Sequence, residues 1–316
     1  MRRSYGQTQA LALPLSSAHV VGSSEAAAVR QAHEHAFSTS RMILLRSVAA
    51  LAVVAFASSE AHAQRIDTTF VEVHGHRLAL YVAGRGGPTV VMEAGGGSWH
   101  RDWIDVVPEV SRNARVVTYD RPGFGLSAAC DAPRTADRVS RELHDALLQA
   151  RLVGPYILVG WSLGGAFSRV FAGAFPSLVE GLVLVDPATD EFYQHVATEF
   201  PDEWTREVMS HFSAVYSDTT RRAEQRELAA FESSMAQARA SDDQHRTPAV
   251  VLVAGRDDEV ATDAISRVWV RELMRWASRR PNTVTRIVPN SGHHIPRQFP
   301  GAVISAIEDV IGRARR

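Results

Sequence analysis

A serine between two glycines is the residue of this sequence best suited to nucleophilic chemistry. Residues 158–167 read LVGWSLGGAF, so Ser162 follows an apolar run and precedes a run of small residues. We expect a strand over 156–161 and a helix from Leu163. A serine in a tight strand-to-helix turn projects its hydroxyl above the sheet, and small neighbours let the backbone pass. This context favours Ser162 as a nucleophile over a hydroxyl in an ordinary glycine-rich turn.

A serine nucleophile needs a base, and the best candidate is His293 in VPNSGHHIP. The segment lies between the last predicted strand and the last predicted helix. His294 is the competitor one residue later. We prefer His293 because Gly292 gives the turn room and places His293 first after the bend.

The base in turn needs a carboxylate that fixes its tautomer and stabilises the imidazolium. Asp257 and Asp258 follow the predicted strand 249–255 and would face the same sheet edge as Ser162. Asp186 in VLVDP also ends a strand. Its Pro187 neighbour, and its place before an interruption of the strand pattern, favour a structural role for Asp186.

Acyl transfer also requires N–H donors where negative charge develops on the former carbonyl oxygen. Leu163, the residue after the nucleophile, is expected to supply one amide. The second is expected from the glycine-rich loop EAGGGSW (93–99), where we select Gly96, with Gly95 and Gly97 as alternatives. Trp161 either lines the substrate pocket or packs beside the turn.

Short β-branched apolar runs alternate with helical patterns along the chain, which predicts right-handed βαβ crossovers and a mainly parallel sheet. Strands are expected at 77–83, 88–94, 114–120, 156–161, 181–187, 249–255 and 283–289, and helices at about 102–112, 135–151, 163–175, 262–278 and 299–314. FVEVHGHRLALYVAG indicates an opening hairpin that turns at His74–Gly75. Residues 188–246 contain no apolar strand and predict a helical cap.

These motifs together resemble the α/β-hydrolase superfamily, in its branch of capped single-domain serine hydrolases. The resemblance runs from about Thr68 to Ile311. It rests on EAGGGSW, YDRPGFGLS (119–127), GPYILVGWSLGGAF (154–167), VLVAGRDDEV (251–260) and NSGHHIPRQFP (290–300). One departure lies in the oxyanion loop, where relatives often have His-Gly and this chain has Ala94-Gly95.

The resemblance carries expectations about the site. It favours Asp258 over Asp257 and gives the chain order Ser162, Asp258, His293. It makes the DRPGFG turn structural, with Phe124 reaching the pocket. It implies a serine hydrolase that cleaves a carboxylic ester of a small molecule, with no cofactor and no metal.

Two other functions stay open. One is an exopeptidase or amidase resembling proline iminopeptidases, in which Glu93, Asp190 or Glu191 would hold the substrate amine. The other is a binding protein of this fold without turnover.

The N-terminal segment RMILLRSVAALAVVAFASSEAHAQ (41–64) has the pattern of a secretory signal peptide. Arg41 and Arg46 precede the apolar run 47–57, and Ala61-His62-Ala63 predicts cleavage before Gln64; an uncleaved anchor is the alternative. We therefore expect residues 1–63 to be an N-terminal extension with a signal peptide, residues 64–316 to be the hydrolase domain, and the protein to be periplasmic or secreted. Met42 is the expected translation start.

The composition is that of an ordinary globular protein, with 45% hydrophobic and 22% charged residues and a formal net charge of −1. The near balance of charges, without a basic stripe, argues against nucleic-acid binding. No membrane span is expected after signal cleavage. Cys130 is the only cysteine, and its CDAP context offers no neighbouring His or Cys. His74 and His76 form an H-x-H pair that would need further ligands to hold a metal.

Overall fold

The computed structural model describes residues 66–202, 217–242, 247–255 and 263–314. The chain separates into two compact units, Met1–His62 and Ala63–Arg316, and the fold below is that of the second. The predicted signal peptide, Asp257 and Asp258 lie outside the described residues.

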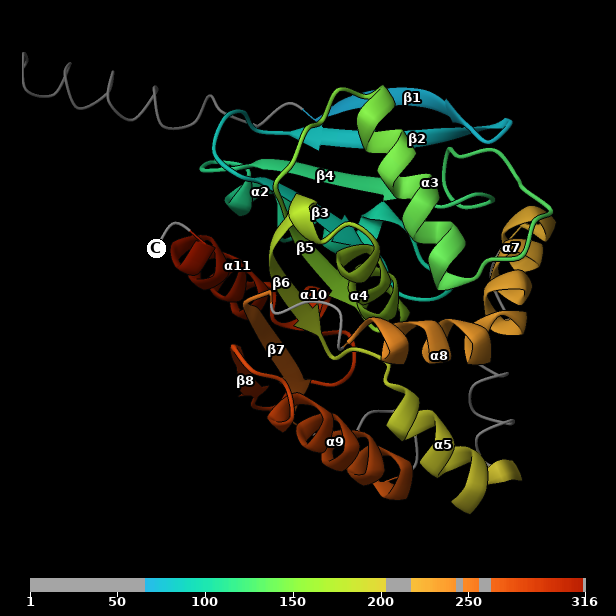
Figure 1. The fold of residues 1–316 in the computed structure, drawn as a ribbon, viewed down its shortest axis with the longest axis vertical. Coiled ribbons are helices and arrows are strands. Elements are labelled where there is room, and N and C mark those ends of the chain that lie inside the picture. The colour runs from blue at the N-terminus through green and yellow to red at the C-terminus, as the bar shows by residue number, and fades with distance from the viewer. Residues whose placement is uncertain (1–65, 203–216, 243–246, 256–262, 315–316) are drawn as a thin grey trace, which may run out of the picture. The chain divides into compact units, whose positions relative to one another are not determined.

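The centre of the fold is an eight-stranded sheet with the order β1-β2-β4-β3-β5-β6-β7-β8 (Figure 1). β1 and β2 pair antiparallel, as do β2 and β4, and all later pairs are parallel. The strands are β1 Asp67–Val73, β2 His76–Ala83, β3 Thr89–Glu93, β4 Arg115–Asp120, β5 Tyr156–Trp161, β6 Val179–Val185, β7 Ala249–Ala254 and β8 Thr283–Val288.

Continuous apolar runs form the middle strands because helices cover both faces of the sheet. Every residue of β3, β5 and β7 is buried. β8, at the edge, is mostly half-buried. The opening hairpin turns where predicted, with φ of 49° at His74 and 85° at Gly75.

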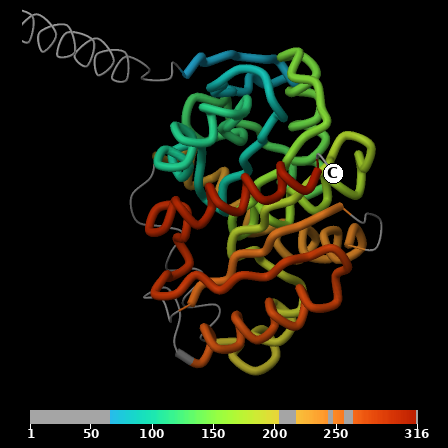
Figure 2. Tube along the Cα trace, turned by 90° about the vertical axis from the view of Figure 1, so that its left-hand side faces the viewer, coloured from blue at the N-terminus to red at the C-terminus, as the bar shows by residue number. Residues whose placement is uncertain are grey.

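The covering helices fall into two layers. α3 (Ala136–Gln149), α4 (Leu163–Ala174) and α9 (Asp263–Ser278) pack on one face, where Leu147, Phe171 and Leu273 join one core cluster. α2 (Val107–Val110) and α11 (Pro300–Ala314) pack on the other, with α10 (Ile295–Gln298) before α11. Figure 2, turned by 90°, shows the red α11 running across the strands.

Three helices fill the described part of the insertion between β6 and β7. They are α5 (Asp190–Glu199), α7 (Asp218–Ala229) and α8 (Phe231–Ser241), and no strand occurs among the described residues of 188–246. α8 packs on α3 and α4 and α5 packs on α9, so the insertion continues the helix layer on that face (Figure 1).

The helix predicted at 102–112 is instead two short pieces, a 3-10 turn over His100–Trp103 and the four-residue α2. Pro108 lies at the start of α2. A proline restricts the residue before it and removes an N–H donor, which explains the break. Among the described helices, none combines the length and apolarity required to cross a membrane.

Candidate active site

Ser162 occupies the tight turn between β5 and α4. Its backbone has φ 52° and ψ −122°, a conformation that residues with a Cβ rarely adopt. Two hydrogen bonds of its own backbone hold it there, from Ser162 N–H to the Val185 carbonyl (3.0 Å) and from Ala188 N–H to the Ser162 carbonyl (3.0 Å). Such a conformation persists only where the surroundings enforce it, and it is a hallmark of functional sites.

The glycines beside Ser162 are required by close backbone contacts. A Cβ at Gly160 would lie 2.4 Å from the Gly164 carbonyl oxygen. A Cβ at Gly164 would lie 2.4 Å from the carbonyl oxygens of both Glu93 and Ala94. The start of α4 therefore packs directly on the end of β3, which brings the nucleophile turn and the glycine-rich loop together.

The imidazole of His293 bridges a serine and an aspartate. His293 Nε2 lies 2.9 Å from Ser162 Oγ, and His293 Nδ1 lies 2.7 Å from Asp186 Oδ2. A hydrogen bond at each ring nitrogen is what a general base requires when its Nδ1–H is held by a carboxylate and its Nε2 receives the serine proton. His294 instead places its ring against Trp161, with 4.8 Å between ring centroids.

The aspartate in this arrangement is Asp186, to which the sequence assigned a structural role. It follows β6 directly, is 1% exposed and has φ 43°. Its Oδ1 accepts a hydrogen bond from Ala254 N–H (3.0 Å), and its own N–H donates to the Leu252 carbonyl (2.8 Å). β7 therefore fixes the carboxylate toward His293. Asp258, the acid preferred from the sequence, lies outside the described residues.

Two tryptophans surround the His293 ring. Trp161 Nε1–H donates to the His293 carbonyl (2.8 Å), which ties the histidine loop to the residue before the nucleophile. Trp161 is 5% exposed, and a Cβ at Gly95 would lie 2.8 Å from its ring. Trp161 thus packs between the loop that carries His293 and the glycine-rich loop that carries Gly95. Trp269 of α9 packs edge-on against His293 at 5.1 Å between centroids; nothing in its sequence context pointed to the site.

Two of the amides predicted to bind the oxyanion have no acceptor among the described residues. Gly97 N–H donates to Glu227 Oε2 (3.0 Å), which removes Gly97 from the candidates. Within the described ranges no group accepts from the amides of Gly96 or Leu163. Leu163 is the first residue of α4, and first-turn amides have no intrahelical partner. Gly96 and Leu163 remain the predicted donors, with Gly95 as the alternative.

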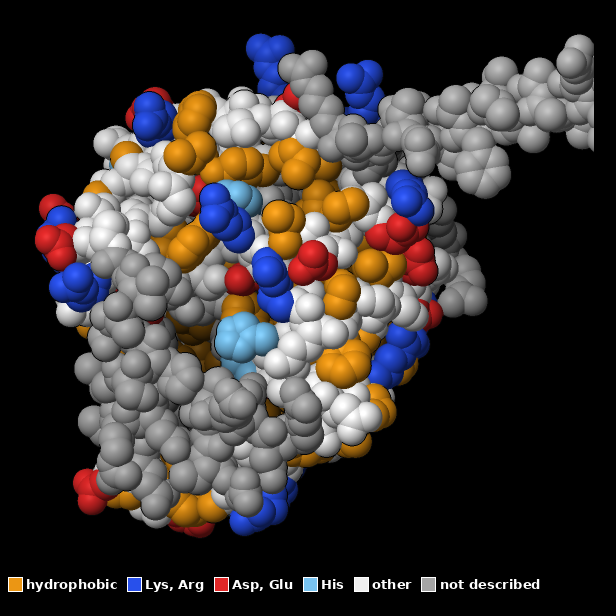
Figure 3. Space-filling model, turned by 180° about the vertical axis from the view of Figure 1, so that it is seen from behind, with side chains coloured by type: hydrophobic (Ala, Val, Ile, Leu, Met, Phe, Trp, Pro, Cys, Tyr) orange, Lys and Arg blue, Asp and Glu red, His pale blue; other side chains and the backbone are white. Residues whose placement is uncertain are grey.

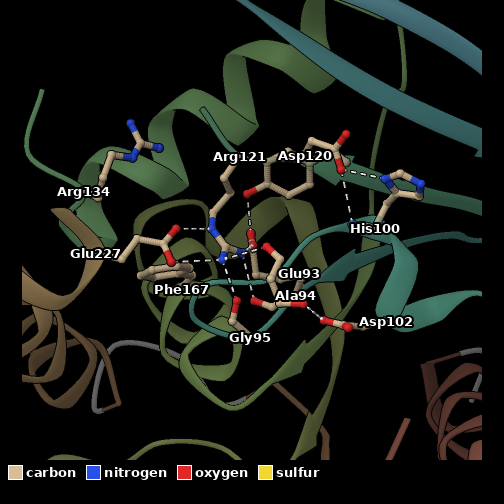
Figure 4. Close-up of polar contacts among 12 residues, drawn as sticks. Glu93, Ala94, Gly95, His100, Asp102, Asp120, Arg121, Arg134, Phe167 and Glu227 are labelled. Atoms are coloured by element: carbon tan, nitrogen blue, oxygen red, sulfur yellow. Dashed lines mark hydrogen bonds and ion pairs between the residues drawn. The ribbon is translucent and has the colours of Figure 1, made fainter. Parts of the chain in front are cut away.

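A buried arginine holds this loop in place (Figure 4). The Arg121 guanidinium donates to Glu93 Oε1 (2.7 Å), Glu227 Oε1 (2.6 Å), and the carbonyls of Ala94 (2.9 Å) and Gly95 (2.6 Å). Burial by itself would lower the pKa of Arg121, but Glu227 and Glu93 more than offset that effect and raise it. Because Glu227 belongs to α7, one cation joins the oxyanion loop to the helical insertion.

Glu224, one turn before Glu227 on α7, also lies against the loop. Its Oε1 is 2.4 Å from where a Cβ at Gly97 would be, and its buried Oε2 has no hydrogen-bond partner among the described residues. Burial first, and then the Glu227 charge, raise the pKa of Glu224 to about 7. No signal in the sequence pointed to Glu224, because its contact with the loop joins residues that are far apart in the chain.

Phe124 does not take the pocket position expected for it. It is 1% exposed, and its ring lies under the Arg121 guanidinium with 5.5 Å between the Arg121 Cζ and the ring centroid. Phe124 therefore supports the arginine cluster. On the face shown in Figure 3, histidine side chains lie beside a hollow that contains hydrophobic side chains.

Comparisons with known proteins agree with the fold. A family model described as alpha/beta hydrolase fold matches residues 88–226, which contain the oxyanion loop, Ser162 and Asp186. The chain has the α/β-hydrolase fold. The superfamily's fold recurs in solved structures, including a haloalkane dehalogenase from Bradyrhizobium elkani USDA94 (TM-score 0.61, 15% identity, 79% of this chain and 99% of that one). An enol-lactonase from Burkholderia xenovorans LB400 gives a TM-score of 0.59 at 19% identity, over 77% of this chain and 100% of that one.

A curated relative shares more sequence over a shorter stretch. It is a 2-hydroxy-6-oxo-6-(2'-aminophenyl)hexa-2,4-dienoic acid hydrolase from Metapseudomonas resinovorans, 32% identical over 146 residues. The match covers 45% of this α/β-hydrolase and 50% of the relative. The chain thus spans about half the length of that relative.

Proposed function

We propose that this α/β-hydrolase cleaves a carboxylic ester of a small molecule through an acyl-enzyme on Ser162. The observation that carries the proposal is the continuous hydrogen-bonded path from Ser162 through His293 to Asp186. His293 takes the hydroxyl proton as the serine oxygen attacks the carbonyl carbon. His293 then gives this proton to the leaving alcohol. In the second half of the reaction His293 takes a proton from water as the water attacks the acyl carbon, and it returns that proton to Ser162 as the acid is released.

The amides of Leu163 and Gly96 would stabilise the tetrahedral intermediate. A preorganised donor is worth about 3–4 kcal/mol of barrier in this type of reaction. Arg121 fixes the loop through the Ala94 and Gly95 carbonyls, so these amides need no reorganisation during the reaction. The chemistry of haloalkane dehalogenases and epoxide hydrolases is disfavoured, because enzymes of those two kinds with this fold carry an aspartate at the position of Ser162.

The acids that could have held a peptide's amine are already paired, which favours an ester over an exopeptidase substrate. Glu93 accepts from Arg121, Asp190 pairs with Arg239 (3.1 Å), and Glu191 pairs with Arg279 (2.6 Å). Each of the three carboxylates thus already has an arginine partner, and Glu191 keeps one oxygen, Oε2, without a hydrogen bond among the described residues.

Turnover of a substrate panel tests the proposal. Purified protein is assayed with p-nitrophenyl esters of increasing acyl length and with aminoacyl anilides. We expect ester hydrolysis, lost by a factor of at least about 10³ in Ser162→Ala, while circular dichroism shows an unchanged fold. Retained ester turnover in Ser162→Ala would refute the nucleophile assignment, and faster anilide cleavage would replace the ester with a peptide.

A further inference from the structure

A second group of chemically capable side chains lies where β2, the loop after β4 and α3 meet. His76 begins β2, Cys130 lies in the loop that leads to α3, and Glu142 is on α3. Their ligand atoms all lie within 4.8 Å of one another. The sequence separates Cys130 from His76 by more than fifty positions, so its local context gave no sign of this histidine.

The imidazole of His76 has a buried ring nitrogen beside this group. His76 is 6% exposed, and its buried Nε2 has no hydrogen-bond partner in the described part of the chain. His76 Nε2 lies 3.8 Å from Glu142 Oε2, which is beyond hydrogen-bond distance. A buried polar atom without a partner costs free energy, and a cation bound between Nε2 and Oε2 would remove that cost.

Glu142 is fixed from its other side. Arg134 donates to both of its oxygens (3.0 and 2.6 Å), and Arg138 Nε donates to Oε1 (2.9 Å). These arginines orient the carboxylate as outer-shell groups orient metal ligands, and their charge reduces the affinity for any cation beside it. Ala128 N–H donates to the Arg77 carbonyl (2.8 Å), which anchors the Cys130 loop next to His76.

We propose that His76, Cys130 and Glu142 form a binding site for a thiophilic divalent metal ion of the zinc class. Imidazole, thiolate and carboxylate are the protein ligands of zinc, at about 2.0–2.3 Å from the ion. Ligand atoms around a tetrahedral ion then lie roughly 3.3–3.6 Å apart. The His76–Glu142 separation of 3.8 Å nearly fits, and all three ligand atoms lie within 4.8 Å of one another before any ion draws them together. Binding forms a sulfur–metal bond and releases the thiol proton to water. Cys130 is partly exposed, which gives the ion and a fourth, water ligand access.

The single cysteine allows an unambiguous test. Co²⁺ is titrated into the full chain under anaerobic conditions, and the thiolate-to-metal charge-transfer absorption is recorded. Because Cys130 is the only cysteine, any such band reports this site. We expect a band that saturates at one equivalent of Co²⁺ and is displaced by Zn²⁺. Cys130→Ser should lose the band, and His76→Gln should bind Co²⁺ at least tenfold more weakly than the wild-type protein. His74→Ala, the matched histidine control, keeps the band.

A wild-type band that is absent, or that is unchanged in His76→Gln, would overturn the proposal. If a variant fails to fold by circular dichroism, the wild-type protein alone decides. Zn²⁺ at saturation should slow alkylation of Cys130 by iodoacetamide at least tenfold, as measured by mass spectrometry. An unchanged alkylation rate would equally overturn it.

Discussion

Asp186 shows how a residue's role depends on its neighbours in space. From the sequence it is an acid before a proline. In the structure, β7 donates to one carboxylate oxygen and His293 contacts the other. A buried carboxylate that accepts from the base stabilises the imidazolium that forms during attack.

The two candidate acids can be separated by amide substitution. Asp186→Asn keeps the shape but allows the wrong histidine tautomer, so kcat should fall about 10³–10⁴-fold. Asp258→Asn should keep most of the activity. Steady-state kinetics on one p-nitrophenyl ester measures both variants. The reverse pattern would assign the acid to Asp258.

Sequence reasoning located residues whose position in the fold depends on local geometry. Ser162 and His293 follow strands and glycine turns, so their loop positions were readable, and the structure brings them within 2.9 Å. Arg121, Trp269 and Glu224 depend on contacts between elements far apart in the chain. Phe124 was misassigned because its place under a buried guanidinium is invisible in the DRPGFG motif.

At the scale of elements, helix α7 is the part of the insertion that contacts the glycine-rich loop 93–99. Glu227 joins it to Arg121 and Gly97, and Ala223 packs on Gly123, where a Cβ would lie 2.6 Å from the Ala223 Cβ. The strands and main helices were predictable because their hydrophobic periodicity matches burial. The contacts of α7 were not, because a polar amphipathic helix does not reveal its partner.

Glu224 makes the stability of the protein depend on pH. The pKa of Glu224 is raised to about 7 in the folded state, so the folded protein retains a proton that the unfolded chain releases near pH 4.5. Stability therefore falls as pH rises between these values, by about 3 kcal/mol at most, and stays level above them.

Glu224→Gln should remove that loss. The variant should match wild type near pH 4.5 and exceed its free energy of unfolding by about 2–3 kcal/mol at pH 8. Urea unfolding at a series of pH values measures the difference. Glu232→Gln, an exposed position on α8, is the control with no expected effect. Parallel pH profiles for wild type and Glu224→Gln would contradict this account.

At the scale of the whole molecule, the predicted signal peptide precedes β1, the first strand of the sheet. We propose that the protein is exported and that processing leaves Gln64 at its N-terminus, so that the hydrolase domain acts in the periplasm or outside the cell.

N-terminal sequencing of precursor and mature protein tests this origin. We expect a mature chain that starts at Gln64 and a precursor that starts at Met42. Met1→Leu should leave expression unchanged, whereas Met42→Leu should abolish it. Peptides from residues 1–41 in the precursor would show that translation begins at Met1.

The central claim of a covalent intermediate on Ser162 is tested most directly by trapping it. The wild-type protein is incubated with a fluorophosphonate, and intact and peptide masses are measured. We expect one phosphonyl group per chain, located on Ser162, with complete loss of ester turnover and no labelling of Ser162→Ala. An unlabelled wild-type protein that still hydrolyses esters, or a label on another residue, would contradict the account.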